Sequence, residues 1–170
     1  MFSLHRLPLI LALCFAGLAS GQAEEKSLLN PADARLLSKK EQKMFGPKSA
    51  GGRYDARMIR AAQIALARAK PEKTWYCWRY VKNALLAAGV VSTRPVTAWA
   101  KQAGEELCKY HGFVQLRIKD PRKAPIGSVI VYGGPDAGHV EIRTKDGFVS
   151  DFVSKTPYPR PLVGVFIKPS

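Results

Sequence analysis

The chain has 170 residues, with 27 Lys and Arg against 13 Asp and Glu, which gives a formal net charge of +14. A basic surface of this size favours a polyanionic partner. We exclude nucleic acid as that partner, because no nucleic-acid-binding motif occurs and the basic stretches lack the interleaved aromatic residues of nucleic-acid readers.

Residues 1–23 have the pattern of a secretory signal peptide. Arg6 precedes an apolar run over residues 7–19, and small residues lead to Ala23, after which we expect cleavage. The run is shorter than the roughly 18 apolar residues that a membrane anchor needs, so we expect no stable membrane insertion once the signal is removed. Cys14 leaves with this segment. These features predict a monomeric protein that is periplasmic or secreted. In that compartment we expect its polyanionic partner to be an anionic polymer of the cell envelope.

The remaining chain has the size of one domain. Residues 24–52 are polar and end in a stretch rich in Gly and Pro, which indicates a leader or linker. The folded domain is therefore expected at residues 53–170. Within it, apolar residues recur every three or four positions over residues 53–70, which predicts an amphipathic helix that Pro71 stops.

Two more helices and several strands are expected downstream. Thr74 is a suitable N-cap for a second helix that ends at Gly89, and residues 95–110 form a third helical candidate. After Gly112 the pattern changes to short β-rich runs separated by Gly, Pro and Asp. The runs cover residues 114–118, 128–132, 139–144, 148–153 and 162–167. Helices followed by strands predict an α+β domain with an antiparallel sheet.

Cys77 falls in the first turn of the helix that Thr74 would cap. Backbone N–H groups there lack intrahelical partners and the helix dipole is positive, so the position favours a thiolate and suits a nucleophile. The alternative is a small core residue, because Cys77 also fits the apolar period that leads to Val81 and Ala84. Cys108 lies in a separate helical segment, and we expect no disulfide between the two cysteines.

A second element concerns His139. Residues 126–142, IGSVIVYGGPDAGHVEI, have the pattern of a strand, a Gly-rich turn and a second strand that begins at His139. A Cys at a helix start, followed by this strand and by Gly-His-Val, resembles the papain-like cell-wall hydrolases of the NlpC and CHAP types. The matching residues are Cys77, GSVIVY at residues 127–132 and GHV at residues 138–140. The resemblance covers roughly residues 53–153 and implies a papain-like fold.

The resemblance also implies a third catalytic residue, about a dozen positions after the His. Asp151 is twelve residues after His139. A three-residue loop at 145–147 would place Asp151 opposite Glu141, on the face of His139, whereas a two-residue turn would place it opposite Ile142 and facing away. We favour the three-residue loop and Asp151 as the residue that orients the imidazole, with Glu141 as the alternative.

The family mechanism then assigns a role to each residue. Cys77 attacks an amide carbonyl as the thiolate, His139 accepts the thiol proton and later protonates the leaving amine, and Asp151 holds the imidazole. The backbone N–H of Cys77 is the expected oxyanion donor. Tyr76 and Trp78 flank the nucleophile and are candidates for contacts with the substrate.

Together with the signal peptide, the resemblance implies an exported cysteine peptidase or amidase that hydrolyses an amide bond in the stem peptides of peptidoglycan, its expected partner. No cofactor is expected, and no metal, because the two cysteines and two histidines left after signal removal lack zinc-ligand spacing. Two alternatives remain open. One is a non-catalytic basic module of the same fold that binds the envelope, and the other is a transglutaminase-like acyltransferase.

The charge gives a first prediction. The signal segment holds one of the basic residues and none of the acidic ones, so the chain that remains carries +13. Binding of the Cys77→Ala protein to purified peptidoglycan sacculi should weaken from low to physiological ionic strength, because the Debye length falls from about 30 Å to about 8 Å. Co-sedimentation at both salt concentrations measures this, and retention that is insensitive to salt would indicate a specific pocket instead.

Overall fold

The computed structural model describes residues 54–170, so the signal peptide and the leader at residues 24–52 lie outside the described residues. Three helices come first: α2 (Arg57–Arg68), α3 (Cys77–Ala87) and α4 (Ala103–His111). Six strands follow: β1 (Val114–Leu116), β2 (Val129–Tyr132), β3 (His139–Arg143), β4 (Phe148–Val149), β5 (Val153–Ser154) and β6 (Leu162–Ile167). They form one antiparallel sheet in the order β1-β6-β2-β3-β4-β5, which confirms the predicted α+β class.

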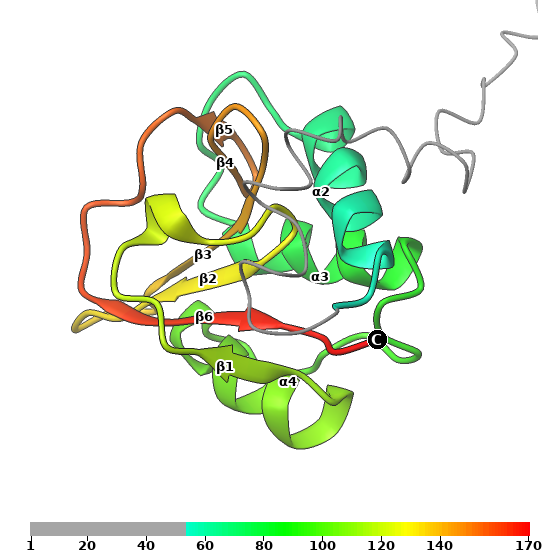
Figure 1. The fold of residues 1–170 in the computed structure, drawn as a ribbon. Coiled ribbons are helices and arrows are strands. Elements are labelled where there is room, and N and C mark those ends of the chain that lie inside the picture. The colour runs from blue at the N-terminus through cyan, green and yellow to red at the C-terminus, as the bar shows by residue number, and fades with distance from the viewer. Residues whose placement is uncertain (1–53) are drawn as a thin grey trace, which may run out of the picture.

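The helices pack against the sheet (Figure 1). Buried apolar residues form two clusters, of which the larger joins the helices to the sheet. Helices α2 and α3 contact each other and β3, while α4 contacts β1 and β6. The larger cluster joins Met58 and Leu85 of the helices to Val131 and Val140 of the central strands. A second cluster on the opposite face includes Ile130, Tyr132, Phe148 and Val165. Alternate residues of β2 therefore enter different clusters, as the pleat requires.

Helix α3 begins at Cys77, two residues later than the predicted cap implies. Tyr76 is its N-cap and makes no side-chain capping bond. Thr74 is not the cap, because its hydroxyl and its N–H both donate to the Asp151 carboxylate. This correction places Cys77 at the first helical position, which is more exposed to the N-terminal dipole than the expected one. The helix ends at Ala87, and Gly89 follows in a left-handed conformation.

The hairpin after β3 differs from both predicted turns. Arg143 pairs with Phe148, so residues 144–147 form a four-residue loop that the Thr144 N–H closes by donating to the Gly147 carbonyl. The Arg143 guanidinium donates to the same Gly147 carbonyl at 2.7 Å and to the Thr144 carbonyl at 2.6 Å, which stabilises the wider loop. The three-residue register that we favoured is therefore wrong.

The predicted strand at residues 148–153 is also interrupted. Strand β4 ends at Val149, and the chain turns back as β5, whose Val153 pairs with Val149. The Ser150 N–H donates to the Phe152 carbonyl within this turn, and the Asp151 carbonyl accepts from the Lys70 N–H. Asp151 is consequently a turn residue joined to the segment before α3, and it has no partner position on β3.

Gly127 sets the approach of the sheet to the start of α2. Its φ of +88° is left-handed, and a Cβ atom at this position would lie 2.7 Å from the backbone carbon of Met58. Gly112, which follows α4, has a φ of +70°, and a Cβ there would meet nothing within 4 Å. The two glycines thus share a backbone conformation but differ in the space around them.

This difference gives a prediction about stability. Gly112→Ala should cost about 1–2 kcal/mol in free energy of unfolding, from left-handed strain alone. Gly127→Ala should cost that amount plus about 1–3 kcal/mol, because α2 must also move away. Urea denaturation of both variants measures the two losses, and equal losses would contradict the close contact between Gly127 and α2.

Candidate active site

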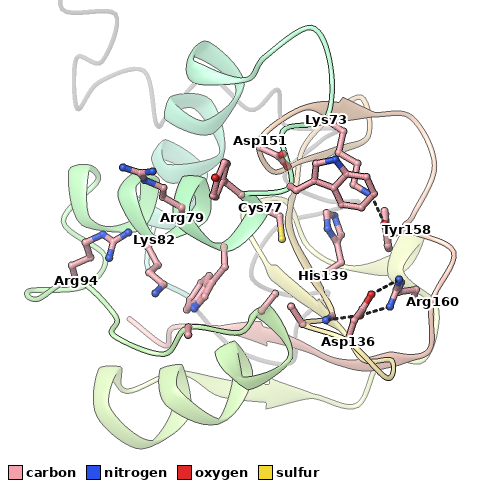
Figure 2. Close-up of a pocket in the computed structure, with 17 residues that line it drawn as sticks. Lys73, Cys77, Arg79, Lys82, Arg94, Asp136, His139, Asp151, Tyr158 and Arg160 are labelled. Carbon is pink, nitrogen blue, oxygen red and sulfur yellow. Dashed lines mark hydrogen bonds and ion pairs between the residues drawn. The ribbon is translucent and has the colours of Figure 1, made fainter.

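One cavity of about 340 Å³ brings the sequence-predicted site residues together, apart from Glu141, which is buried and outside its lining. Its wall includes the start of α3, the segment before η3 (Ala100–Gln102), the turn before β3 and the loop that precedes β6. Figure 2 shows that the Cys77 sulfur lies beside the His139 ring in this cavity. Asp151 also lines the cavity, as do Tyr76 and Trp78.

The start of α3 presents Cys77 to the cavity. Because Cys77 is the first residue of the helix, the N–H groups of the first turn have no intrahelical acceptors and their dipoles favour negative charge near the sulfur. The side chain is partly exposed, and Cys77 and Cys108 are both free thiols. The position therefore combines access to the cavity with an environment that favours a thiolate.

The position and tilt of the His139 ring are fixed by its surroundings. His139 is the first residue of β3 and is 3% exposed. Gly138 before it has a φ of +74°, and a Cβ there would lie 2.5 Å from the Tyr132 carbonyl oxygen. The ring stacks on Tyr158 with centroids 3.9 Å apart and planes at 23°. Packing on this aromatic ring limits the rotation of the imidazole.

Two neighbours act on the charge of His139. Burial is the largest single influence and lowers its pKa, but the contacts with Cys77 and then with Glu141 together raise the pKa above the ordinary value. The Nε2 atom lies 3.6 Å from the Glu141 carboxylate and has no hydrogen-bond partner among residues 54–170. This separation is slightly long for a hydrogen bond, so the contact is mainly a charge attraction that a small movement would tighten.

Glu141 is held in place by Tyr132. The carboxylate is 2% exposed, and one of its oxygens accepts the Tyr132 hydroxyl at 2.5 Å. Burial and the negative charge of Glu141 both raise the pKa of Tyr132, so the phenol stays protonated and continues to donate. The other carboxylate oxygen faces His139. The carboxylate thus lies where a residue that orients the imidazole is needed.

Asp151, our favoured orienting residue, makes other contacts. One oxygen accepts from the Thr74 N–H at 2.6 Å and from its hydroxyl at 2.9 Å, and the other accepts the Ser150 hydroxyl at 2.9 Å. Burial, the largest influence, raises the pKa of Asp151, but the bonds from Thr74 and Ser150 outweigh it and lower the pKa. The carboxylate therefore anchors the segment that leads into Cys77 rather than contacting His139.

The anchored segment carries a strained residue. Trp75 has a φ of +69°, an uncommon conformation for a residue with a side chain, and is 77% exposed. The Lys73 ammonium lies 3.7 Å from the centre of the Trp75 ring and donates to the Tyr158 hydroxyl at 2.6 Å. Lys73 therefore links the segment before Cys77 to the ring that stacks on His139.

The flanking aromatic residues take different positions. Tyr76 is 58% exposed at the cavity, where a substrate could contact it. Trp78 is buried, and its indole N–H donates to the Thr97 hydroxyl at 3.1 Å. Tyr158 was missed by sequence reasoning, because it lies in a loop without periodicity and no motif connects it to His139.

Two further properties concern the part of the chain that the structure describes. No group of three His, Cys, Asp or Glu side chains in residues 54–170 is arranged to hold a metal ion. The helices within the same residues are too short or too polar to cross a bilayer.

Comparison with known proteins yields one informative likeness. No family model matches the sequence, and no curated protein does. Among solved structures, the chain resembles the effector in the crystal structure of the type VI native effector–immunity complex Tae3–Tai3 from Ralstonia pickettii. The sequences are 25% identical, the TM-score is 0.55, and the match covers 66% of this chain and 98% of the other. A second crystal structure of that complex, with selenomethionine, matches at 27% identity with a TM-score of 0.49.

This likeness confirms the papain-like fold that the sequence motifs imply. The match covers nearly the whole length of the Tae3 chain and about two thirds of this one, so the shared part has the size of the folded domain.

The contacts of Asp151 predict a pH-dependent contribution to stability. Its folded-state pKa is lowered, so the carboxylate stabilises the fold above the unfolded-state value of about 3.9, and this contribution is lost as the pH falls through the folded-state pKa. Asp151→Asn should lower the free energy of unfolding at pH 7 by about 1–3 kcal/mol, because the Thr74 donors lose a charged acceptor.

Urea denaturation at pH 7 and at pH 3 measures this effect. The wild type should lose more stability than Asp151→Asn between the two values. Glu105→Gln is a suitable control, because this exposed carboxylate on α4 contacts neither Thr74 nor Ser150. Equal pH dependence of the wild type and Asp151→Asn would contradict the anchoring role.

Proposed function

We propose that the protein is an exported cysteine hydrolase that cleaves an amide bond in the stem peptides of peptidoglycan. The observation that carries the proposal is the contact chain from Cys77 at a helix start, through the buried His139, to the buried carboxylate of Glu141. The likeness to the Tae3 effector supports the fold on which this chemistry rests. The net positive charge of the domain suits capture by an anionic wall.

The contacts allow a balanced acyl-transfer sequence. His139 accepts the Cys77 thiol proton, and the thiolate sulfur bonds to the amide carbonyl carbon. The resulting oxyanion would accept a hydrogen bond from the Cys77 backbone N–H at the start of α3. When the C–N bond breaks, the imidazolium gives its proton to the leaving amine, and a thioester remains on Cys77. His139 then deprotonates a water molecule, which attacks the thioester and regenerates the thiol.

In this mechanism Glu141, not Asp151, orients the imidazole. The negative charge of Glu141 favours the imidazolium form of His139, which agrees with the raised pKa of His139. Tyr132 keeps the carboxylate in place through the hydroxyl bond. Tyr158 supports the opposite side by stacking on the ring. The imidazolium that the thiolate needs as its counter-ion is thereby stabilised before substrate binds.

Two other functions use the same fold. A non-catalytic envelope-binding module would not need a thiol in contact with a buried His–Glu pair, and this contact favours the enzyme. A transglutaminase-like acyltransferase would form the same thioester and transfer the acyl group to an amine instead of water. Adding an amine acceptor to the digestion and analysing the products by mass spectrometry separates hydrolysis from transfer.

Digestion of purified peptidoglycan tests the catalytic assignment. The wild type should release fragments with new carboxyl and amino ends, and Cys77→Ala should release none. His139→Ala should lower kcat by about 10²- to 10⁴-fold, because the proton carrier is lost. Cys108→Ser on α4 should retain full activity, since Cys108 lies outside the cavity. Full activity of Cys77→Ala would overturn the proposal.

The role of Glu141 is tested by the pH profile. Glu141 raises the pKa of His139, so Glu141→Gln should move the alkaline limb of the kcat/KM profile to lower pH and reduce its maximum by at least about tenfold. Asp151→Asn should leave the alkaline limb in place, whatever its effect on stability. A shift of that limb in Asp151→Asn but not in Glu141→Gln would return the orienting role to Asp151.

A further inference from the structure

One arm of the cavity is lined by three cations. Arg79 and Lys82 project from α3, and Arg94 comes from the segment that follows this helix. All three line the same cavity as Cys77 and His139. Figure 2 shows them on one side of Cys77, with the Asp136–Arg160 ion pair on the other side of His139. The three residues are called the cationic arm below.

No carboxylate among the described residues forms an ion pair with this arm. Within residues 54–170, no Asp or Glu lies in ion-pair contact with Arg79, Lys82 or Arg94. The nearest acidic influence on Lys82 is Glu106, whose oxygens accept from the N–H groups of Val96 and Thr97 and from the Thr97 hydroxyl.

The surroundings of Lys82 disfavour its positive charge. The residue is 5% exposed, and its ammonium group donates to the Thr97 carbonyl and lies 5.1 Å from the centre of the Trp78 ring. Burial lowers the pKa of Lys82, and repulsion by Arg94 lowers it further, with only partial compensation from Glu106. A buried cation next to a second cation is costly unless an anion joins them.

The two arginines are positioned by neutral groups. The Arg94 Nε–H donates to the Asn83 side-chain oxygen at 2.9 Å, and the Arg79 guanidinium lies 5.8 Å from the centre of the Tyr76 ring. Neither partner neutralises charge, so the guanidinium forks can still bind an anion. The other cations of the cavity differ, because Arg160 binds both Asp136 oxygens and Lys73 donates to Tyr158.

We propose that the cationic arm binds a free carboxylate of the substrate, next to the amide that Cys77 attacks. The inference rests on the proposed function and specifies its substrate: a stem-peptide fragment with an ionised carboxylate close to the scissile bond. Planar carboxylates match the guanidinium fork and accept two parallel N–H bonds, which a neutral amide cannot reproduce with the same strength. The carboxylate also adds to the partial compensation that Glu106 gives to the charge of Lys82.

Binding measurements with an inactive protein test this inference separately from catalysis. The probes are stem-peptide fragments released from purified peptidoglycan, either with their carboxylates free or after chemical conversion of these carboxylates to amides. Isothermal titration of the Cys77→Ala protein should show free fragments binding about tenfold or more tightly than amidated ones, as expected for charged hydrogen bonds. In the same background, Arg79→Gln with Arg94→Gln should abolish this preference.

A matched double variant controls for the loss of two charges. Arg117 and Lys119 are exposed and lie outside the cavity, so Arg117→Gln with Lys119→Gln should keep the full preference for free carboxylates. Arg79 and Arg94 are also exposed, and thermal unfolding should show that their double variant remains folded. The same loss of preference in both double variants would overturn the inference in favour of a general charge effect.

The remaining outcomes separate the inference from the proposed function. Equal binding of free and amidated fragments, or no binding of either, would overturn the carboxylate site even if the wild type digests peptidoglycan. A clear preference for free carboxylates that depends on Arg79 and Arg94 supports the site, even if digestion fails and the hydrolase assignment falls with it.

Discussion

The contact between the start of α3 and the start of β3 is the constraint on which the rest of the site depends. The helix supplies Cys77 and the strand supplies His139, and each is the first residue of its element. A one-residue shift of the strand would turn the imidazole to the other face of the sheet. Gly138, the Tyr158 ring and the paired strand β2 all fix that position. The apolar packing of the helices on the sheet thus determines the geometry of the polar residues.

Buried charged groups have different partners on the two sides of Cys77. Toward the sheet, Glu141 is buried with a phenol donor and a histidine as its partners. Toward the segment after α3, Lys82 is buried with a carbonyl, an aromatic ring and the Arg94 cation near it, and the charge of Glu106 compensates it only in part. In the first arrangement the protein itself supplies both the donor and the acceptor. In the second the compensation is incomplete, and an anionic ligand can add to it.

The fold class could be predicted from the sequence, because helical periodicity and Gly-rich turns are local signals, and the Gly-His-Val motif indicated that His139 would share a site with Cys77. The carboxylate that lies beside His139 could not be chosen in the same way. Its assignment depended on the length of the loop after β3, and Arg143 stabilises a four-residue loop through contacts with two carbonyl groups that no spacing reveals. Thr74 illustrates the same limit. Its capping pattern was suitable, but a buried carboxylate 77 positions away recruits both of its donors.

Helix α3 carries Cys77 and two members of the cationic arm on one rigid element. At about 1.5 Å of rise per residue, Lys82 lies about 7.5 Å further along the helix axis than Cys77. An extended peptide spans about 3.3–3.6 Å per residue, so this interval corresponds to about two residues of substrate. The helix would fix the distance between Cys77 and the carboxylate-binding residues. Substrates would then be selected by the spacing between their amide and their carboxylate as well as by their charge.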